Sequence, residues 1–389
     1  MLSLASRPGT LSFALGLPAP ELFPKADLSR AAAAVLEDDP LSLQYTPPLE
    51  RLKEHVVQLM VRRGISCSVG QVFLTAGAQQ GLSLLARLLL EPGSRVAIEQ
   101  LTYTGFRQVL EPFSPELVGV PTCADDGMDV DTLASDLATK RRPALIYVIP
   151  EGHNPLGVSL GVEKRARLAL LAARYGVPVI EDDAYGFLQY GNDMTIPLRA
   201  HDTDWVCYVG SFSKILAPGL RQGWLVVPEE FGVKLSIAKE SNDLNTATLA
   251  QRILCAYLDT GLLPMHMERL RCEYRARRNA MLQALEAHFP EGARWRSPEA
   301  GVFVWVELPS NVQIEEVLKL AVEEEQVAFL PGHAFSAHGA DATHCMRLNF
   351  SYSPVPAIEE GIYRLSRAVD RALHNSRRWS GTRRDNEKS

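Results

Sequence analysis

Seven short apolar runs alternate with amphipathic helical segments between residues 72 and 227. Runs of this length and composition are typical of strands that are buried on both faces. The expected strands are Val72–Thr75, Arg95–Glu99, Leu117–Val120, Ala144–Ile149, Val177–Glu181, Val206–Val209 and Trp224–Val227. The expected helices between them are Ala78–Leu90, Tyr103–Leu110, Asp131–Ala138 and Val162–Tyr175. This alternation predicts an α/β fold with a mostly parallel seven-stranded sheet flanked by helices, and such sheets bind ligands at the carboxyl ends of their strands.

The pattern changes outside this region and predicts a second, smaller domain. At 389 residues the chain is long for one simple core. A long helical region (Leu235–Leu258), a charged helical region (Met265–Phe289) and an alternating strand (Gly301–Glu307) are typical of an α+β domain. We therefore expect an N-terminal arm with part of the small domain at 1–45, a large domain at 46–265, the small domain at 266–374, and a polar, disordered tail at 375–389.

Charge and cysteine content narrow the classes of partner and compartment. The net charge is −6 and no run of 18 apolar residues occurs, so we expect neither a nucleic-acid partner nor a membrane span. The six cysteines are scattered singly without the spacing of a metal site or a disulfide framework. Reduced thiols of this kind predict a cytoplasmic protein without a bound metal.

The segment from residue 211 to residue 223 carries the first chemical motif. Lys214 directly follows Ser211 and Ser213, and Arg221 lies seven residues further on. An amine can condense with an aldehyde, while hydroxyls and a guanidinium can hold a phosphate group. Pyridoxal 5'-phosphate (PLP) is a common cofactor with both groups. A solvated lysine in a surface loop would show the same local pattern, so other segments have to decide between the two interpretations.

The segment Glu181–Tyr185 ends the fifth expected strand with three carboxylates and a tyrosine. A carboxylate at Asp182 could accept a hydrogen bond from a protonated ring nitrogen, and Tyr185 could reach a ring hydroxyl. The same residues would also suit a strand-end turn or a helix cap.

Two further strand ends carry polar or small residues. Asn154 supplies an amide in the loop Pro150–Gly157, which alone would be an ordinary Asn-Pro turn. The segment Thr75–Gly81 places small residues between a strand and a helix, and backbone N–H groups at a helix N-terminus bind phosphate well. A small-residue turn without a ligand would look the same.

The order and spacing of these four segments resemble the motifs of fold type I, PLP-dependent aminotransferases of class I and II. The resemblance covers about residues 10–370, and it is strongest to the 2-aminoadipate and kynurenine aminotransferase group and to the similar domain of MocR-type regulators. It implies PLP as cofactor and ping-pong transfer of an amino group between an α-amino acid and a 2-oxo acid. It also implies a homodimer with shared active sites.

The resemblance also implies roles for individual residues. Lys214 would form the internal aldimine with PLP and act as the base, with its pKa lowered by burial and neighbouring positive charge. Asp182 would pair with the pyridine nitrogen, and Asn154 and Tyr185 would hold the phenolic oxygen. Tyr103 would stack on the ring. The phosphate would be held by Ala78, Gln79, Ser211, Ser213 and Arg221.

Three more residues are implied to serve the substrate or the neighbouring subunit. Arg347 would bind the substrate α-carboxylate in a bidentate manner, with Asn154 nearby, and Gly16 would lie over the substrate. Tyr45 would reach the phosphate of the neighbouring subunit. Arg347 could instead be a structural arginine paired within the small domain, and Tyr103 could be a core aromatic at the start of a helix.

Some positions depart from the family pattern. Leu49 stands where a glycine is usual, which leaves the local backbone open, and Ala78 stands where a serine is common, which removes one phosphate hydroxyl. His153 precedes Asn154 and could tune substrate choice, or it could be a loop histidine with no role in the reaction.

The fold does not determine the reaction, so other functions stay open at this point. A decarboxylase, a racemase, a β/γ-replacement enzyme or an amino-acid oxidase would use the same lysine. A PLP-binding regulatory module is a further alternative, although a winged helix would have to precede the matched region, which begins near residue 10.

Overall fold

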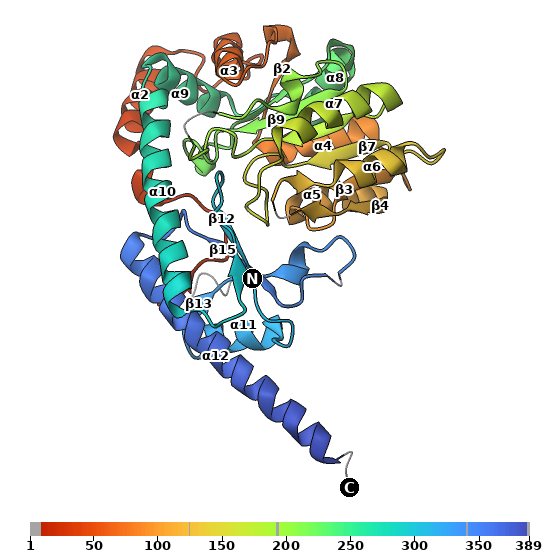
Figure 1. The fold of residues 1–389 in the computed structure, drawn as a ribbon. Helices are drawn as coiled ribbons and strands as arrows, with labels where there is room; N and C mark the ends of the chain where they lie inside the picture. The colour runs from red at the N-terminus through yellow and green to blue at the C-terminus, as the bar shows by residue number, and fades with distance from the viewer. Residues whose placement is uncertain (1–8, 124, 192–193, 340, 387–389) are drawn as a thin grey trace.

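The computed structural model describes residues 9–386 apart from 124, 192–193 and 340, with side chains through residue 375. A seven-stranded sheet forms the centre of the larger part (Figure 1). Its order is β2-β10-β9-β8-β7-β3-β4, and only β10 runs antiparallel to its neighbours. The strands are β2 (Val72–Thr75), β3 (Arg95–Glu99), β4 (Glu116–Val120), β7 (Leu145–Val148), β8 (Val179–Asp182), β9 (Val206–Ser211) and β10 (Gly223–Val226). The predicted mostly parallel sheet is confirmed.

Each central strand sends alternate side chains into two separate apolar layers, as the period of two requires. In β7, Tyr147 packs on one face of the sheet while Ile146 and Val148 pack on the other. Helices cover both faces, which explains why the strands read as continuous apolar runs. These helices are α4 (Ala78–Leu89), α5 (Thr104–Leu110), α6 (Val130–Leu137) and α7 (Val162–Tyr175).

A four-stranded antiparallel sheet forms the centre of the smaller part, with the order β11-β12-β15-β14. Its strands are β11 (Arg294–Trp295), β12 (Phe303–Glu307), β14 (Leu330–Pro331) and β15 (Cys345–Asn349). Helix α12 (Val355–Asn386) packs against α10 (Leu263–His288) and α11 (Ile314–Glu323). In Figure 1, α10 runs from the region of α9 beside the large sheet to the smaller part.

The N-terminal arm joins the smaller part through the backbone. Its strand β1 (Leu11–Ser12) pairs in parallel with β13 (Val327–Ala328). The remaining elements are α2 (Lys25–Asp38), α3 (Glu50–Arg62), α8 (Gly232–Asp243), α9 (Thr248–Asp259), the hairpin strands β5 (Thr122–Cys123) and β6 (Gly127–Met128), and short 3-10 turns. Among the described residues, no helix combines the length and apolar character that a membrane span requires.

Two segments differ from the sequence-based expectation. The long helical region expected over Leu235–Leu258 is two helices, because Leu244 has a φ of 58° and ends α8. Asn245 then binds the Thr46 carbonyl instead of continuing the helix. Helix α12 continues to Asn386, into the segment 375–389 that we expected to be disordered. Polar composition shows that a segment has little to bury, but arginine, aspartate and asparagine do not by themselves end a helix.

Candidate active site

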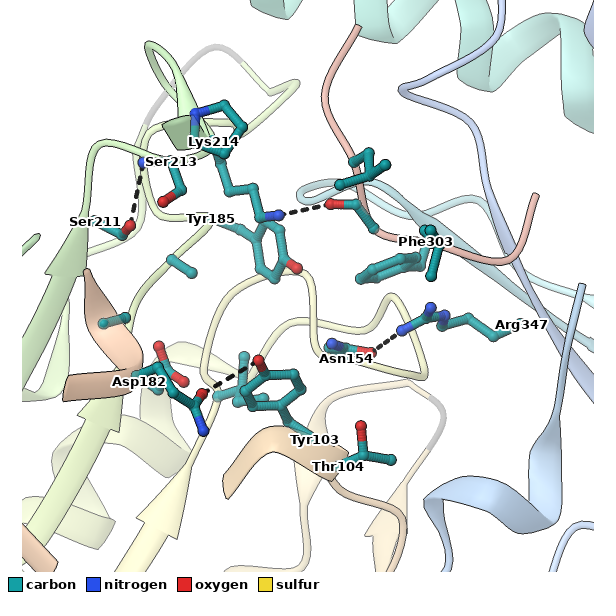
Figure 2. Close-up of a pocket in the computed structure, with 18 of the residues that line it drawn as sticks. Tyr103, Thr104, Asn154, Asp182, Tyr185, Ser211, Ser213, Lys214, Phe303 and Arg347 are labelled. Carbon is teal, nitrogen blue, oxygen red and sulfur yellow. Dashed lines mark hydrogen bonds between the residues drawn. The ribbon is translucent and has the colours of Figure 1, made fainter. Parts of the chain in front are cut away.

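A cavity of about 450 Å³ lies where the carboxyl ends of β7, β8 and β9 face the arm and the four-stranded sheet. Figure 2 shows the side chains of several elements converging on it. It brings together all but one of the residues for which the resemblance implied a role: Gly16, Ala78, Gln79, Tyr103, Asn154, Asp182, Tyr185, Ser211, Ser213, Lys214, Arg221 and Arg347.

Lys214 lies in the turn after β9, and its amine points into the cavity (Figure 2). Its Nζ donates a hydrogen bond of 2.6 Å to the carbonyl oxygen of Gly16. Burial lowers the pKa of Lys214 to about 8, helped by the positive charges of Arg347 and Arg221 and opposed by Asp182. Lys214 is therefore a much better proton acceptor near neutral pH than an ordinary lysine.

Asp182 is the last residue of β8 and has one hydrogen-bonded and one free oxygen. The hydroxyl of Tyr147 donates a bond of 2.8 Å to its Oδ2. Its Oδ1 is buried and has no hydrogen-bond partner among the described residues. Burial raises the pKa of Asp182 to about 6, and the bond from Tyr147 opposes that shift. A buried free carboxylate oxygen fits the protonated ring nitrogen of PLP, which would supply both a donor and a positive charge.

Tyr103 and Gln79 form the opposite wall. Tyr103 precedes α5, and its hydroxyl donates to Gln79 Oε1 at 3.3 Å. The amide of Gln79 in turn donates to the Gly105 carbonyl at 2.7 Å. A Cβ added at Gly105 would lie 2.3 Å from Tyr103 Cζ. The ring of Tyr103 can therefore take this position only because residue 105 has no side chain.

The other end of the cavity is suited to an anion. The N-terminus of α4 contributes Ala78, and Ser211 and Ser213 lie beside it. The Nη2 of Arg221 donates to the Ala76 carbonyl at 3.0 Å. Gly77 has a φ of +81°, and a Cβ added there would lie 2.5 Å from Arg221 Nη2. A helix N-terminus, two hydroxyls and a guanidinium form a donor set that fits a phosphate.

Arg347 lies on β15 at the side of the cavity that belongs to the smaller part. Its Nη1 donates to Asn154 Oδ1 at 2.5 Å, and its Nη2 donates to the Ala14 carbonyl at 2.5 Å. The guanidinium lies 4.0 Å from the ring centroid of Phe303 and 4.8 Å from that of Phe335. Burial lowers the pKa of Arg347 to about 10, which still leaves it charged at neutral pH.

Three residues highlighted in the sequence lie outside the cavity. Tyr45 is 84% exposed and does not line it in the part of the chain that the structure describes. Leu49 caps α3 in an extended conformation with a φ of −70°, which any residue can adopt, so no glycine is needed there. His153 is buried, and its Nε2 lies 2.8 Å from Glu99 Oε2. This contact favours a structural role for His153 over a role in substrate choice.

Sequence reasoning missed some residues of the site. Tyr147 was assigned only to a buried strand, although a tyrosine hydroxyl in a fully buried strand needs a partner. Thr104 and Leu330 also line the cavity, and their segments carry no motif. For these residues only the packing of separate segments identifies the role.

A separate cluster joins His55, Cys255 and Asp259 at the contact of α3 and α9. His55 Nε2 lies 2.8 Å from Asp259 Oδ1, and the guanidinium of Arg51 binds the same oxygen at 2.9 Å. The carboxylate is thus already neutralised by an arginine, and we assign no metal to it.

Comparisons with known proteins agree with this geometry. The model of the family "Aminotransferase class I and II" matches residues 22–365. The aromatic-amino-acid aminotransferase 1 of Thermococcus litoralis is 39% identical over 378 residues, which cover 95% of this chain and 90% of that protein. The multiple substrate aminotransferase of Thermococcus profundus has a TM-score of 0.90 at 37% identity, covering 96% of this chain and 94% of that one.

A third match was solved with a compound that contains the cofactor. The α-aminoadipate aminotransferase of Thermus thermophilus, in complex with N-(5'-phosphopyridoxyl)-L-leucine, has a TM-score of 0.89 at 37% identity and covers 94% of each chain. The matches confirm the fold type I architecture, PLP as the cofactor and transamination as the reaction. These aminotransferases favour transamination over the decarboxylase, racemase, replacement and oxidase alternatives. The chain belongs to the class I and II aminotransferase family.

Proposed function

We propose that Lys214, Asp182 and Arg347 carry the transfer of an amino group between an α-amino acid and a 2-oxo acid. The observation that supports this most directly is their convergence on one cavity, with an amine, a buried carboxylate and a buried guanidinium facing the same space. When bound, PLP supplies an aldehyde that condenses with amines and a ring that takes up the electrons of the substrate Cα–H bond.

Lys214 binds the cofactor and then moves the proton. With a pKa of about 8, about a tenth of its amine is unprotonated at pH 7. The unprotonated amine can accept the proton from the substrate α-carbon as a base, and it can then donate this proton as an acid. Arg221 and Arg347 favour the unprotonated amine because each adds positive charge nearby.

Arg347 and Asn154 bind the substrate α-carboxylate. The two Nη groups of Arg347 donate to the Asn154 and Ala14 oxygens, and a substrate carboxylate can replace these oxygens because it is a stronger acceptor than either.

Other residues of the cavity hold the cofactor. Asp182 holds the ring nitrogen, Asn154 and Tyr185 hold the phenolic oxygen, and Tyr103 covers the ring. The phosphate is held by Ala78, Gln79, Ser211, Ser213 and Arg221.

A second copy of the chain completes the site. Leu43 and Tyr45 are 77% and 84% exposed, and Leu41 beside them is 50% exposed. Three large apolar side chains in one short segment suit burial in a homodimer. Tyr45 then reaches the phosphate of the partner subunit. The protein resides in the cytoplasm, in keeping with its six free cysteines.

The two sheets support the same division of the chain that we expected from the sequence. The seven-stranded sheet falls within 46–265 and the four-stranded sheet within 266–374. The arm at 1–45 joins the second of these through β1.

The role of Lys214 is tested by trapping. Borohydride reduction of the protein with PLP, followed by peptide mass spectrometry, should place the adduct on Lys214, and Lys214→Ala should lose both adduct and turnover. Lys53→Ala is the matched control, because burial also lowers the pKa of Lys53 but this lysine lies on α3, outside the cavity. An adduct on another lysine, or turnover retained in Lys214→Ala, would refute the assignment.

The role of Arg347 is tested by Arg347→Lys. Lysine keeps the charge but not the paired donors, so kcat/KM for amino acids should fall about 30- to 150-fold, the equivalent of about 2–3 kcal/mol. For an amine that lacks the carboxylate, the rate constant of the half-reaction should stay at the wild-type value. Equal losses for both substrates would show that Arg347 acts on the fold and not on the carboxylate.

A further inference from the structure

We infer that Tyr147 is a positioning residue for Asp182: it holds one carboxylate oxygen and so directs the other toward the ring nitrogen of the cofactor. The inference rests on the proposed pairing of Asp182 with that nitrogen. It concerns a residue of the strand next to β8 that lies outside the cavity lining.

Strand register places Tyr147 where it can do this. In the parallel pair of β7 and β8, Tyr147 lies opposite Ile180, and Asp182 lies two residues further along β8. Residues two apart in a strand face the same side of the sheet, so Tyr147 and Asp182 share a face. A tyrosine is long enough to reach the carboxylate diagonally, and its hydroxyl donates to Oδ2 at 2.8 Å.

The ring of Tyr147 is held in place by α5. It stacks on Phe106 with 3.8 Å between the ring centroids and an angle of 13° between the planes. Both side chains are fully buried. The hydroxyl therefore cannot turn away from Asp182 without opening the core between α5 and the sheet.

The bond leaves Asp182 with one free oxygen and favours its ionised form. Burial and the neighbouring Asp183 raise the pKa of Asp182, whereas the bond from Tyr147 and the charge of Lys214 lower it. Tyr147 stays a neutral donor, because burial and Asp182 raise its own pKa well above 10. The charge of Asp183 is itself paired, because Arg63 Nη2 lies 2.9 Å from Asp183 Oδ2.

These contacts decide where the shared proton lies. Between Asp182 and the ring nitrogen a single proton can sit on either partner. A donor bond to Asp182 makes the carboxylate less basic and so moves the proton toward the nitrogen. Without the Tyr147 hydroxyl, the carboxylate of Asp182 has no hydrogen-bond partner among the described residues, and its neutral form becomes more favourable.

The test is Tyr147→Phe, which keeps the stacked ring and removes the hydroxyl. With PLP labelled at the ring nitrogen, the ¹⁵N resonance of the holoenzyme at fixed pH should move from the protonated toward the unprotonated value. The rate constant kcat should fall about tenfold, as expected for one lost bond to a charged group. KM for the amino acid should not change, because Arg347 is untouched.

Tyr208→Phe is the matched control. Tyr208 lies on β9, is equally buried, and donates to Asp183 at 2.9 Å. Loss of this hydroxyl should leave the ¹⁵N resonance unchanged. Equal shifts in both variants would indicate a general loosening of the sheet and would overturn the inference.

A wild-type ¹⁵N resonance and a wild-type kcat in Tyr147→Phe would also overturn it, while leaving the roles of Lys214 and Asp182 intact. If Tyr147→Phe does not fold, replacement of Tyr147 by 3-fluorotyrosine tests the same role, because 3-fluorotyrosine is a stronger hydrogen-bond donor of nearly the same size. The ¹⁵N resonance must then stay at the protonated value or move toward it, and a move the other way refutes the role. Failure of the trapping experiment on Lys214 would instead refute the proposed function.

Discussion

The amine of Lys214 lies 2.6 Å from the carbonyl oxygen of Gly16, 198 positions earlier in the chain. The arm that carries Gly16 is fixed to the smaller part of the molecule. Phe13 donates to the Ala328 carbonyl at 2.8 Å and accepts from the Asn349 N–H at 2.9 Å. The position of the reactive amine thus depends on the large sheet, the arm and the small sheet together.

The titration of Lys214 follows from this burial. In the apoprotein its amine should titrate near pH 8, and Arg221→Gln should raise the midpoint because it removes a positive charge. NMR of ¹³C-methylated lysines measures this, and the signal is identified by its absence in Lys214→Arg. A midpoint near 10.5 in the wild type, or a lower one in Arg221→Gln, would contradict the prediction.

The lowered pKa of Lys214 also determines how the free energy of unfolding changes with pH. The folded-state pKa is below the unfolded one, so between pH 8 and 10.5 the unfolded chain binds more protons than the folded one. The contribution of Lys214 to the free energy of unfolding therefore rises with pH across this window, and its full unfavourable value is present below pH 8. Comparison of denaturant midpoints for wild type and Lys214→Met should show that the difference shrinks as the pH rises.

Gly105→Ala should displace the ring of Tyr103. The new Cβ would lie 2.3 Å from Tyr103 Cζ, so one of the two has to move. We expect the dissociation constant of PLP to rise about tenfold to a hundredfold, measured by fluorescence titration of the apoprotein. Gly232→Ala is the control, since its Cβ would meet only Phe73 at 4.0 Å. Unchanged affinity in Gly105→Ala would mean that Tyr103 does not contribute to PLP binding.

Arg63→Ala should destabilise the protein more than loss of a surface ion pair. Arg63 and Asp183 are both fully buried and lie 2.9 Å apart, so the variant leaves a buried carboxylate without its main partner. We expect a loss of about 3–5 kcal/mol in the free energy of unfolding, measured by urea denaturation. Arg364→Ala breaks the exposed pair with Glu360 and should cost less than about 0.5 kcal/mol. Similar losses in the two variants would show that burial adds nothing to the first pair.

Mixed dimers test whether Tyr45 acts across subunits. Lys214→Ala and Tyr45→Ala should each impair the homodimer, whereas a mixed dimer regains one site with an intact Lys214 and an intact Tyr45. Random mixing should recover about a quarter of wild-type activity, because half of the dimers are mixed and each has one working site. Light scattering should show a dimer throughout. Absence of recovery, or a fully active monomer, would contradict the shared site.

Much of the architecture could be predicted because it follows from local pattern. The strands of the large sheet are buried on both faces, so their apolar runs are continuous and their ends are marked by polar residues such as Asp182. The motif around Lys214 lies within 13 residues, so its chemistry is visible in a short stretch. The break at Leu244 was missed because a leucine with a positive φ carries no local signal.

The sequence by itself determined the seven-stranded sheet, the lysine and the carboxylate, since periodicity and short-range spacing are properties of neighbouring residues. Only the tertiary structure decided that Tyr147 binds Asp182, that Gly16 faces Lys214 and that Gly105 makes room for Tyr103. The Tyr147–Asp182 and Gly16–Lys214 contacts join residues 35 and 198 positions apart, and the close approach at Gly105 depends on how a side chain turns over its own backbone. Contacts of this kind arise from packing, which local sequence does not encode.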